Sequence, residues 1–289
     1  MSWIGDWLAD WFREILVDGI LSNFEGMFDL VNSRVADIAT QVGQTPQSFN
    51  ASIFSMIQTL SETIILPIAG MILTYVLVYE LIQMITEKNN LQDFDTFNLY
   101  KWIFKTFIAI FIMTNIFNIV MAIFDIAQHV VNASAGFITG TLELGDPAMM
   151  YALEAQLETA GVGELIGILM LSFIARWVIW AIAIIVFVIV IGRMIEIYLT
   201  ISLAPIPFAT MSNREWSSMG FNYLKALFAV GFQGFLIMIC VAIYGVLVAG
   251  IVNASDINIA LVTLLGYTVL LCFMLFKTGG LSKSIFGAH

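Results

Sequence analysis

Side chains that could do chemistry are few in this sequence, and the most regular set follows one face of an apolar run. Its six members recur at helical spacing: Lys101, Lys105, Asn115, Asn118, Asp125 and His129. Polar groups at membrane depth face protein or water rather than lipid. This polar stripe therefore predicts either the lining of a pore or vestibule, or hydrogen bonds between neighbouring helices.

The sequence contains no arrangement typical of an enzyme. His129 and His289 belong to no metal-ligand motif, and Cys240 and Cys272 lie in apolar runs, as small buried hydrophobic residues do. Neither a phosphate-binding loop nor the spacing of a catalytic triad is present. We expect no catalytic residue, no cofactor and no metal site.

The elements that position the polar stripe must be membrane helices. Of the 289 residues, 60% are hydrophobic and 11% are charged, and the mean hydropathy is +0.95. A soluble domain carries about 25% charged residues. Several apolar runs also reach the roughly 20 residues that a helix needs to cross a bilayer. The predicted fold is therefore all-α, a polytopic membrane helical bundle.

We expect about five transmembrane helices. They cover residues 63–79, 102–124, 177–192, 227–248 and 259–276. The third is placed between Arg176 and Arg193, about 25 Å apart, because a charge at mid-membrane is costly. Trp177 and Trp180 then lie at the outer interface. The apolar stretch 165–175 is left outside the lipid core, where it needs a protein partner.

Charge places the N-terminus outside and the C-terminus in the cytoplasm. Lysines and arginines gather in the segments assigned to one side: Lys88, Lys101, Lys105, Arg193, Arg214, Lys225, Lys277 and Lys283. The outer loop, residues 132–164, is acidic and holds neither Lys nor Arg. Because Lys and Arg mark the cytoplasmic side, the pattern predicts a multi-pass protein of the cytoplasmic membrane. Glu80 and Gln83, near the inner end of the first span, are expected to pair with the lysines of the next loop.

The first 50 residues are predicted to form an extracellular amphipathic helical region, followed by the transmembrane bundle over 51–289. Trp3, Trp7 and Trp11 stand four apart and begin an apolar stripe, while acidic residues occupy the other face. This face would anchor in the outer leaflet, cover the stretch 165–175, or join subunits.

The most distinctive stretch is "TISLAPIPFATMSNREWSSM", residues 200–219, which we expect to be a cytoplasmic linker. Pro205 and Pro207 should end the preceding helix, because proline disfavours helical geometry in the residue before it. The apolar residues should tuck into the bundle or line a mouth. Asn213 is expected to cap a helix from Arg214, and Trp216 to anchor at the interface.

The stretch "ISLAPIPFATMSNREW", followed by "NYLKALFAVGFQGFLIMICVAIY", resembles the TrbL family of conjugal-transfer type IV secretion systems. The family pattern has a long helix, an Ala-Pro turn, a charged linker with Trp, and a helix bearing Gly and Gln. The matching residues are Ala204, Pro205, Arg214, Trp216, Gly231, Gln233 and Gly234. The resemblance covers residues 164–276 best, and it is closest to the small versions in conjugative elements of Gram-positive bacteria.

The resemblance implies an oligomeric ring, a pentamer or hexamer, that forms a channel for DNA or a DNA-protein substrate. Its implied partners are membrane lipids, other secretion components including ATPases, and, transiently, a DNA-relaxase complex. Two alternatives stay open: an autonomous channel or transporter for ions or small solutes, and a non-conducting scaffold. The few scattered cations argue against a DNA-binding lining, which should be basic.

Overall fold

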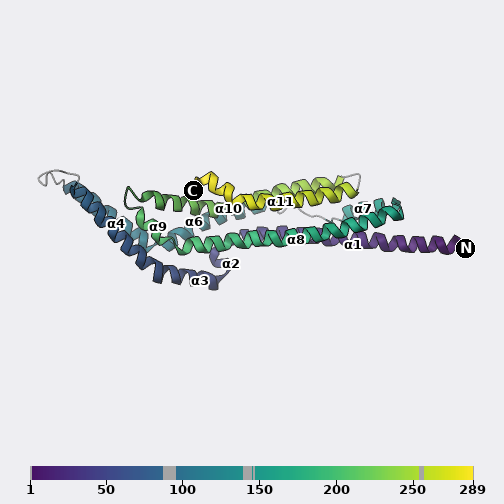
Figure 1. Cartoon of the computed structure of the whole chain (residues 1–289), viewed down its shortest axis with the longest axis horizontal. Helices are drawn as coiled ribbons and strands as arrows, with labels where there is room; N and C mark the ends of the chain where they lie inside the picture. Colours follow the sequence, from purple (N-terminus) through teal and green to yellow (C-terminus); the bar gives the residue numbers. More distant parts are fainter. Residues whose placement is uncertain (1, 87–95, 139–144, 146, 254–256, 289) are drawn as a thin grey trace. The chain divides into compact units, whose positions relative to one another are not determined.

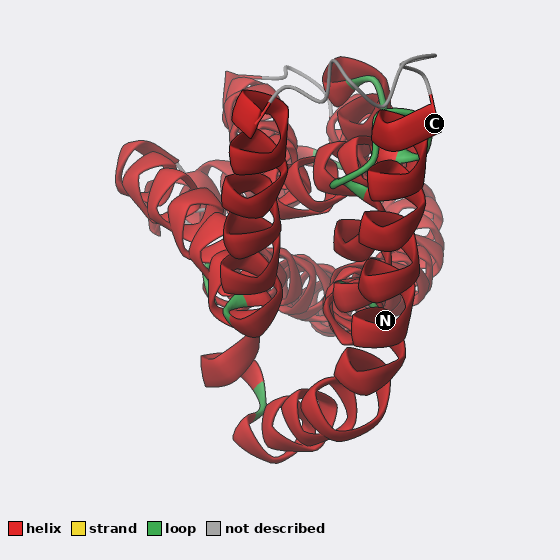
Figure 2. Ribbon diagram, turned by 90° about the vertical axis from the view of Figure 1, so that its left-hand side faces the viewer, coloured by secondary structure: helices red, strands yellow, loops and turns green. Residues whose placement is uncertain are grey.

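The computed structural model describes residues 2–86, 96–138, 145, 147–253 and 257–288, and every regular element in these ranges is a helix (Figures 1 and 2). The elements are α1 Ser2–Val42, α2 Pro46–Phe49, α3 Ala51–Leu60, η1 Ser61–Ile65, α4 Leu66–Thr86, α5 Thr96–Thr114, α6 Ile116–Ile138, α7 Pro147–Thr159, α8 Val162–Ser202, α9 Pro205–Thr210, α10 Ser217–Ala249, η3 Gly250–Asn253 and α11 Ile257–Phe286. The predicted all-α class is confirmed.

Six segments of the described chain are long and apolar enough to cross a membrane: Ala51–Thr86, Phe97–Thr114, Ile116–Ser134, Val162–Ser202, Ser217–Ala249 and Ile257–Phe286. The polytopic membrane bundle is thereby confirmed, while the orientation of the chain stays a prediction. The predicted span 102–124 falls on both α5 and α6, which are separated by Asn115. The Asn115 side chain donates to the Phe111 carbonyl at 2.9 Å. Its backbone N–H donates to the Ile112 carbonyl, three residues back, at 3.2 Å. The side-chain amide thus takes the carbonyl that the Asn115 backbone N–H would use in a regular α-helix, and the helix is interrupted there.

The first candidate span contains a widened turn. α3, η1 and α4 follow one another without a gap, and η1 is a π-helix over Ser61–Ile65. Pro67, two residues after the end of η1, has no backbone N–H, so it cannot donate to the carbonyl four residues earlier. The Leu66 N–H bonds to the Ser61 carbonyl, five residues back, as the π turn requires.

The helices pack as two compact units. The first comprises Met1–Val42, Asn132–Val190 and Leu236–Lys277, and the second comprises Gly43–Val131, Ile191–Phe235 and Thr278–His289. α6, α8, α10 and α11 each contribute residues to both units. The predicted N-terminal region, residues 1–50, likewise contributes to both.

In the first unit, α1 packs on α7 and on the beginning of α8. Its buried face carries apolar side chains three or four positions apart: Leu16, Ile20, Phe24, Met27, Phe28 and Val31. Gly19 lies so close to α8 that an added Cβ would stand 3.3 Å from Leu169. Arg13 donates to the Ala160 carbonyl at 2.7 Å and to that of Glu158, which satisfies the end of α7.

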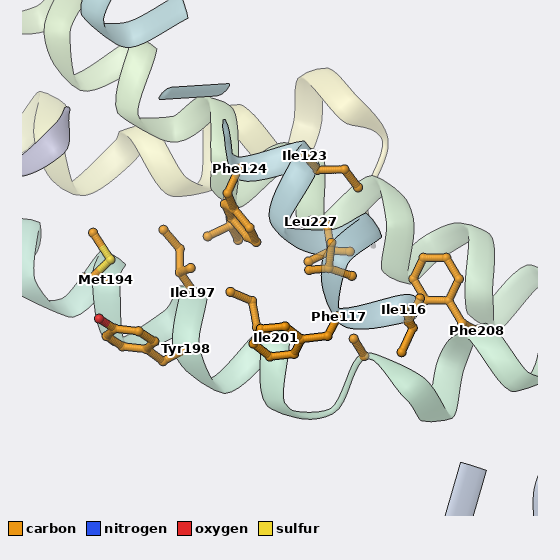
Figure 3. Close-up of a cluster of buried hydrophobic side chains, with 13 residues drawn as sticks. Ile116, Phe117, Ile123, Phe124, Met194, Ile197, Tyr198, Ile201, Phe208 and Leu227 are labelled. Carbon is orange, nitrogen blue, oxygen red and sulfur yellow. The ribbon is translucent and has the colours of Figure 1, made fainter. Parts of the chain in front are cut away.

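In the second unit, the core lies among α6, the end of α8, α9 and the start of α10 (Figure 3). Phe117 and Phe124 come from α6, Ile201 from α8, and Leu227 from α10. Tyr198 at the edge of this core donates to the Pro46 carbonyl at 2.6 Å. The same core sets the orientation of α6, because one face of that helix is filled by these contacts.

The approach of α10 to α6 gives a stability prediction. A Cβ on Gly231 would lie 3.2 Å from the Cβ of Ala127, whereas a Cβ on Gly192 of α8 would meet nothing within 4 Å. We expect Gly231→Val to destabilise the protein by about 1–3 kcal/mol through overpacking. Thermal unfolding in detergent measures the effect, with Gly192→Val as the matched control. Equal melting temperatures for the two variants would contradict this account.

Candidate functional site

The polar stripe of α6 lies on the face that the second unit leaves uncovered. Asn118, Asp125 and His129 are exposed, whereas Phe117 and Phe124 are buried in the core. Within the described part of the chain, no hydrogen-bond or ion-pair partner meets any of the three polar side chains. We call these three residues the α6 polar face. Since α6 has the length and apolarity of a membrane span, its carboxylate must meet water or another polypeptide.

The other three residues of the predicted stripe lie elsewhere. Lys105 forms an ion pair with Glu80 of α4, as expected for Glu80 from the sequence. Lys101 stands over the ring of Phe97, 4.4 Å from its centroid. Asn115 lies at the break between α5 and α6, where its side chain donates to the Phe111 carbonyl. The structure thus brings together half of the stripe, and the helix break separates α5 from the face of α6.

The linker after α8 is held against α4 by aromatic stacking. The Trp216 ring lies 5.5 Å from the ring of Tyr79 and 5.8 Å from that of Tyr75, with interplanar angles of 9° and 10°. The neighbouring Glu215 carboxylate accepts from Gln83 at 2.9 Å and from the Tyr79 hydroxyl at 3.4 Å. We call these five residues the linker latch. Its sequence signal is the spacing of four from Tyr75 to Tyr79 to Gln83, which puts them on one face of α4.

The prolines and Asn213 shape the linker before the latch. α8 ends at Ser202, and Pro205 is the first residue of α9, where a missing N–H is tolerated. Phe208 and Ala209 are buried, so the apolar part of the linker lies inside the second unit. Asn213 accepts from the Glu215 N–H at 2.7 Å and so stabilises the turn, while α10 begins only at Ser217.

Two polar side chains tie α10 to its neighbours within the second unit. Arg193 of α8 is buried and donates to the Gly231 carbonyl at 3.2 Å and to that of Val230 at 3.5 Å. Gln233 donates to the Thr278 hydroxyl of α11 at 3.3 Å. Both are interhelical bonds of the kind that joins membrane helices.

The beginning of α1 presents an uncovered apolar face. Trp7 and Trp11 are 62% and 50% exposed, and Leu8, Phe12 and Ile15 beside them are exposed as well. Among the α1 side chains that the structure describes, Leu16 is the first buried one. The side chain of Trp3 lies outside the described residues. These large apolar side chains are free to meet lipid or a further polypeptide.

The described residues hold no group of three or more His, Cys, Asp or Glu side chains that could bind a metal ion. The candidate site thus consists of three features: the α6 polar face, the linker latch and the exposed apolar face at the beginning of α1.

A comparison with protein families finds a match over residues 31–205 to the family described as TrbL/VirB6 plasmid conjugal transfer like protein. This chain belongs to that family. Neither a curated protein nor a solved structure matches the chain. The TrbL/VirB6 match takes in the α6 polar face, Ala204 and Pro205, but it ends before Arg214, Trp216 and Gln233, which were part of the resemblance seen in the sequence. The protein is a multi-pass membrane component of conjugal transfer.

The linker latch gives a prediction about local opening. Replacing Trp216 by alanine removes both ring stacks, each worth about 0.5–1.5 kcal/mol beyond the area buried. We expect faster trypsin cleavage after the exposed Arg214 in the folded protein, followed by mass spectrometry of the fragments. Trp180→Ala is the control, because Trp180 lies in the first unit and is 51% exposed. If both variants are cut after Arg214 at the wild-type rate, the latch does not hold the linker.

Proposed function

We propose that this TrbL/VirB6 protein assembles into a closed ring of identical copies, a pentamer or hexamer, in the cytoplasmic membrane. The ring would form part of the channel that passes DNA or a DNA-protein complex across that membrane. The α6 polar face carries this proposal. Asp125 and His129 are exposed on a helix of membrane-spanning length, and in the described residues they have no partner. In a ring with this face inward, both side chains would reach water.

The charges favour a conduit over a DNA-binding site. The α6 polar face carries one carboxylate, one imidazole and one amide, and the chain has a formal net charge of −10. Tight DNA binding requires a basic surface that neutralises phosphates. A lining without such a surface would hold the polyanion weakly and let it slide. The protein itself would do no catalysis, and partner ATPases of the secretion system would supply the energy.

The uncovered end of α1 supports self-association. An exposed face with Trp7, Trp11 and Phe12 resembles the aromatic-rich centre of a protein interface. Asp10 and Glu14 border this face and are exposed. We therefore place subunit contacts at this face, with lipids around the remaining apolar surface.

Thiol labelling tests whether the α6 polar face meets water. In a protein with Cys240→Ala and Cys272→Ala, Asp125→Cys should react with a charged, membrane-impermeant thiol reagent once the ring is formed in liposomes. Ile126→Cys is the matched control, because Ile126 is 57% exposed and adjacent in sequence, yet apolar and suited to lipid. We expect Asp125→Cys to react much faster. Equal reactivity at the two positions would contradict a water-filled space along this face.

The assembly itself is tested by native mass spectrometry and electron-microscopy class averages of the purified protein. A closed ring is expected, and Trp7→Ser with Trp11→Ser should dissociate it, because the exposed apolar face loses its largest side chains. Tyr100→Ser with Phe104→Ser is the control: these two are also four apart and are 67% and 66% exposed. A stable wild-type monomer would overturn the ring. Ion flux through such monomers in liposomes would favour an autonomous channel, and its absence a scaffold.

A further inference from the structure

A cavity of about 630 Å³ opens beside α1 and α8 within the first unit. It is lined by Gly26, Leu30, Phe173, Arg176, Trp177 and Trp180. One charged side chain thus stands among aromatic and apolar ones. None of these lining residues is a carboxylate, so the cavity has a positive charge and no internal counter-ion.

A chain of neutral hydrogen bonds orients the Arg176 guanidinium. Its Nη1 donates to the side-chain Oδ1 of Asn23 at 3.2 Å, and the side-chain Nδ2 of Asn23 donates to the Ser172 hydroxyl at 3.0 Å. Asn23 is 3% exposed and Ser172 is fully buried, so this support is fixed inside the unit. No carboxylate among the described residues forms an ion pair with Arg176. Most of the five guanidinium N–H groups remain available for a ligand.

Gly26 lets the guanidinium lie against α1. A Cβ at this position would stand 3.2 Å from Cζ of Arg176 and 3.3 Å from Nη2. A Cβ would therefore require the guanidinium to shift by a few tenths of an ångström, and a branched side chain would require a larger shift. Close packing at Gly26 and the bond to Asn23 together preorganise the charge.

Two tryptophans form the apolar wall of the cavity. Trp177 and Trp180 are 67% and 51% exposed, and their rings meet edge to face at 5.8 Å. Indole rings favour the level of lipid headgroups, where one end is apolar and the other wet. Phe173 continues the apolar surface along α8. A fixed guanidinium next to such a wall matches a molecule with an anionic head and hydrocarbon tails.

We propose that this cavity binds an anionic membrane phospholipid. The phosphate would accept hydrogen bonds from Arg176, since guanidinium and phosphate match as a charge-assisted, bidentate pair. The acyl chains would lie along Phe173, Trp177 and Trp180. No carboxylate lines the cavity to balance the quaternary ammonium of a choline headgroup. Phosphatidylglycerol, whose headgroup carries no cation, should therefore bind in preference to phosphatidylcholine. This site does not depend on the ring or on the channel.

Native mass spectrometry of the full chain in detergent tests the lipid site. The wild type should retain phosphatidylglycerol, and Arg176→Gln should bind it roughly tenfold or more weakly, the effect expected from losing a hydrogen bond to a charged group. Arg34→Gln is the control, because Arg34 is on the same unit but pairs with Asp37 at 3.3 Å. Equal retention of phosphatidylglycerol by Arg176→Gln and wild type would overturn the site.

Two further arms separate the possible ligands and do not require Arg176→Gln to fold. Wild-type protein should retain phosphatidylglycerol more strongly than phosphatidylcholine, and equal retention would exclude recognition of an anionic lipid. Inorganic phosphate at matched concentration should leave the bound lipid in place, whereas displacement of the lipid would assign the site to free phosphate. Gly26→Val keeps the charge but displaces the guanidinium, so it should also weaken phosphatidylglycerol binding.

Discussion

Apolar surroundings impose one requirement on this protein: a charged or polar group on a membrane helix needs a polar partner. Lys105 meets Glu80, and Lys283 meets Glu196 at 2.9 Å. Arg193 is turned inward to backbone carbonyls of α10. Each of these contacts joins two helices of the second unit, so they add to the apolar packing of its core.

Two of the places where the described residues leave this requirement unmet are the places where we expect function. On the α6 polar face, Asp125 and His129 point away from the core of the second unit. In the first unit, Arg176 is oriented by Asn23 but has no carboxylate beside it. A group that the chain itself does not satisfy must be satisfied by water, lipid or another copy. In the proposed ring, water would meet the α6 polar face, and in the proposed lipid site, a phosphate would meet Arg176.

Small residues and the linker latch allow close contacts between helices. Gly231 brings its backbone close to α6, and Gly26 brings its backbone close to the Arg176 guanidinium, so an added Cβ at either position would force the neighbour to shift. The latch joins Trp216 to Tyr75 and Tyr79 of α4 and so fixes the chain reversal between α8 and α10. Membership of the TrbL/VirB6 family places this architecture in conjugal transfer, although the family match ends at residue 205, before the latch residues of the linker.

The sequence by itself determined the membrane class, the helical content and the end of α8 near Pro205, because hydropathy, periodicity and proline geometry act over short distances along the chain. It also placed Asn118, Asp125 and His129 on one helical face. Only the tertiary structure decided that this face is the uncovered one. It also decided that Lys105 pairs with Glu80 instead of lying with the α6 polar face, and that Glu215 contacts Tyr79, 136 positions away in the sequence. The bond from Arg176 to Asn23 likewise depends on the tertiary structure, because it joins residues 153 positions apart. The break at Asn115 is a local feature that hydropathy and periodicity did not reveal. Periodicity tells which residues share a face, but the neighbour of that face is chosen by packing among all the helices.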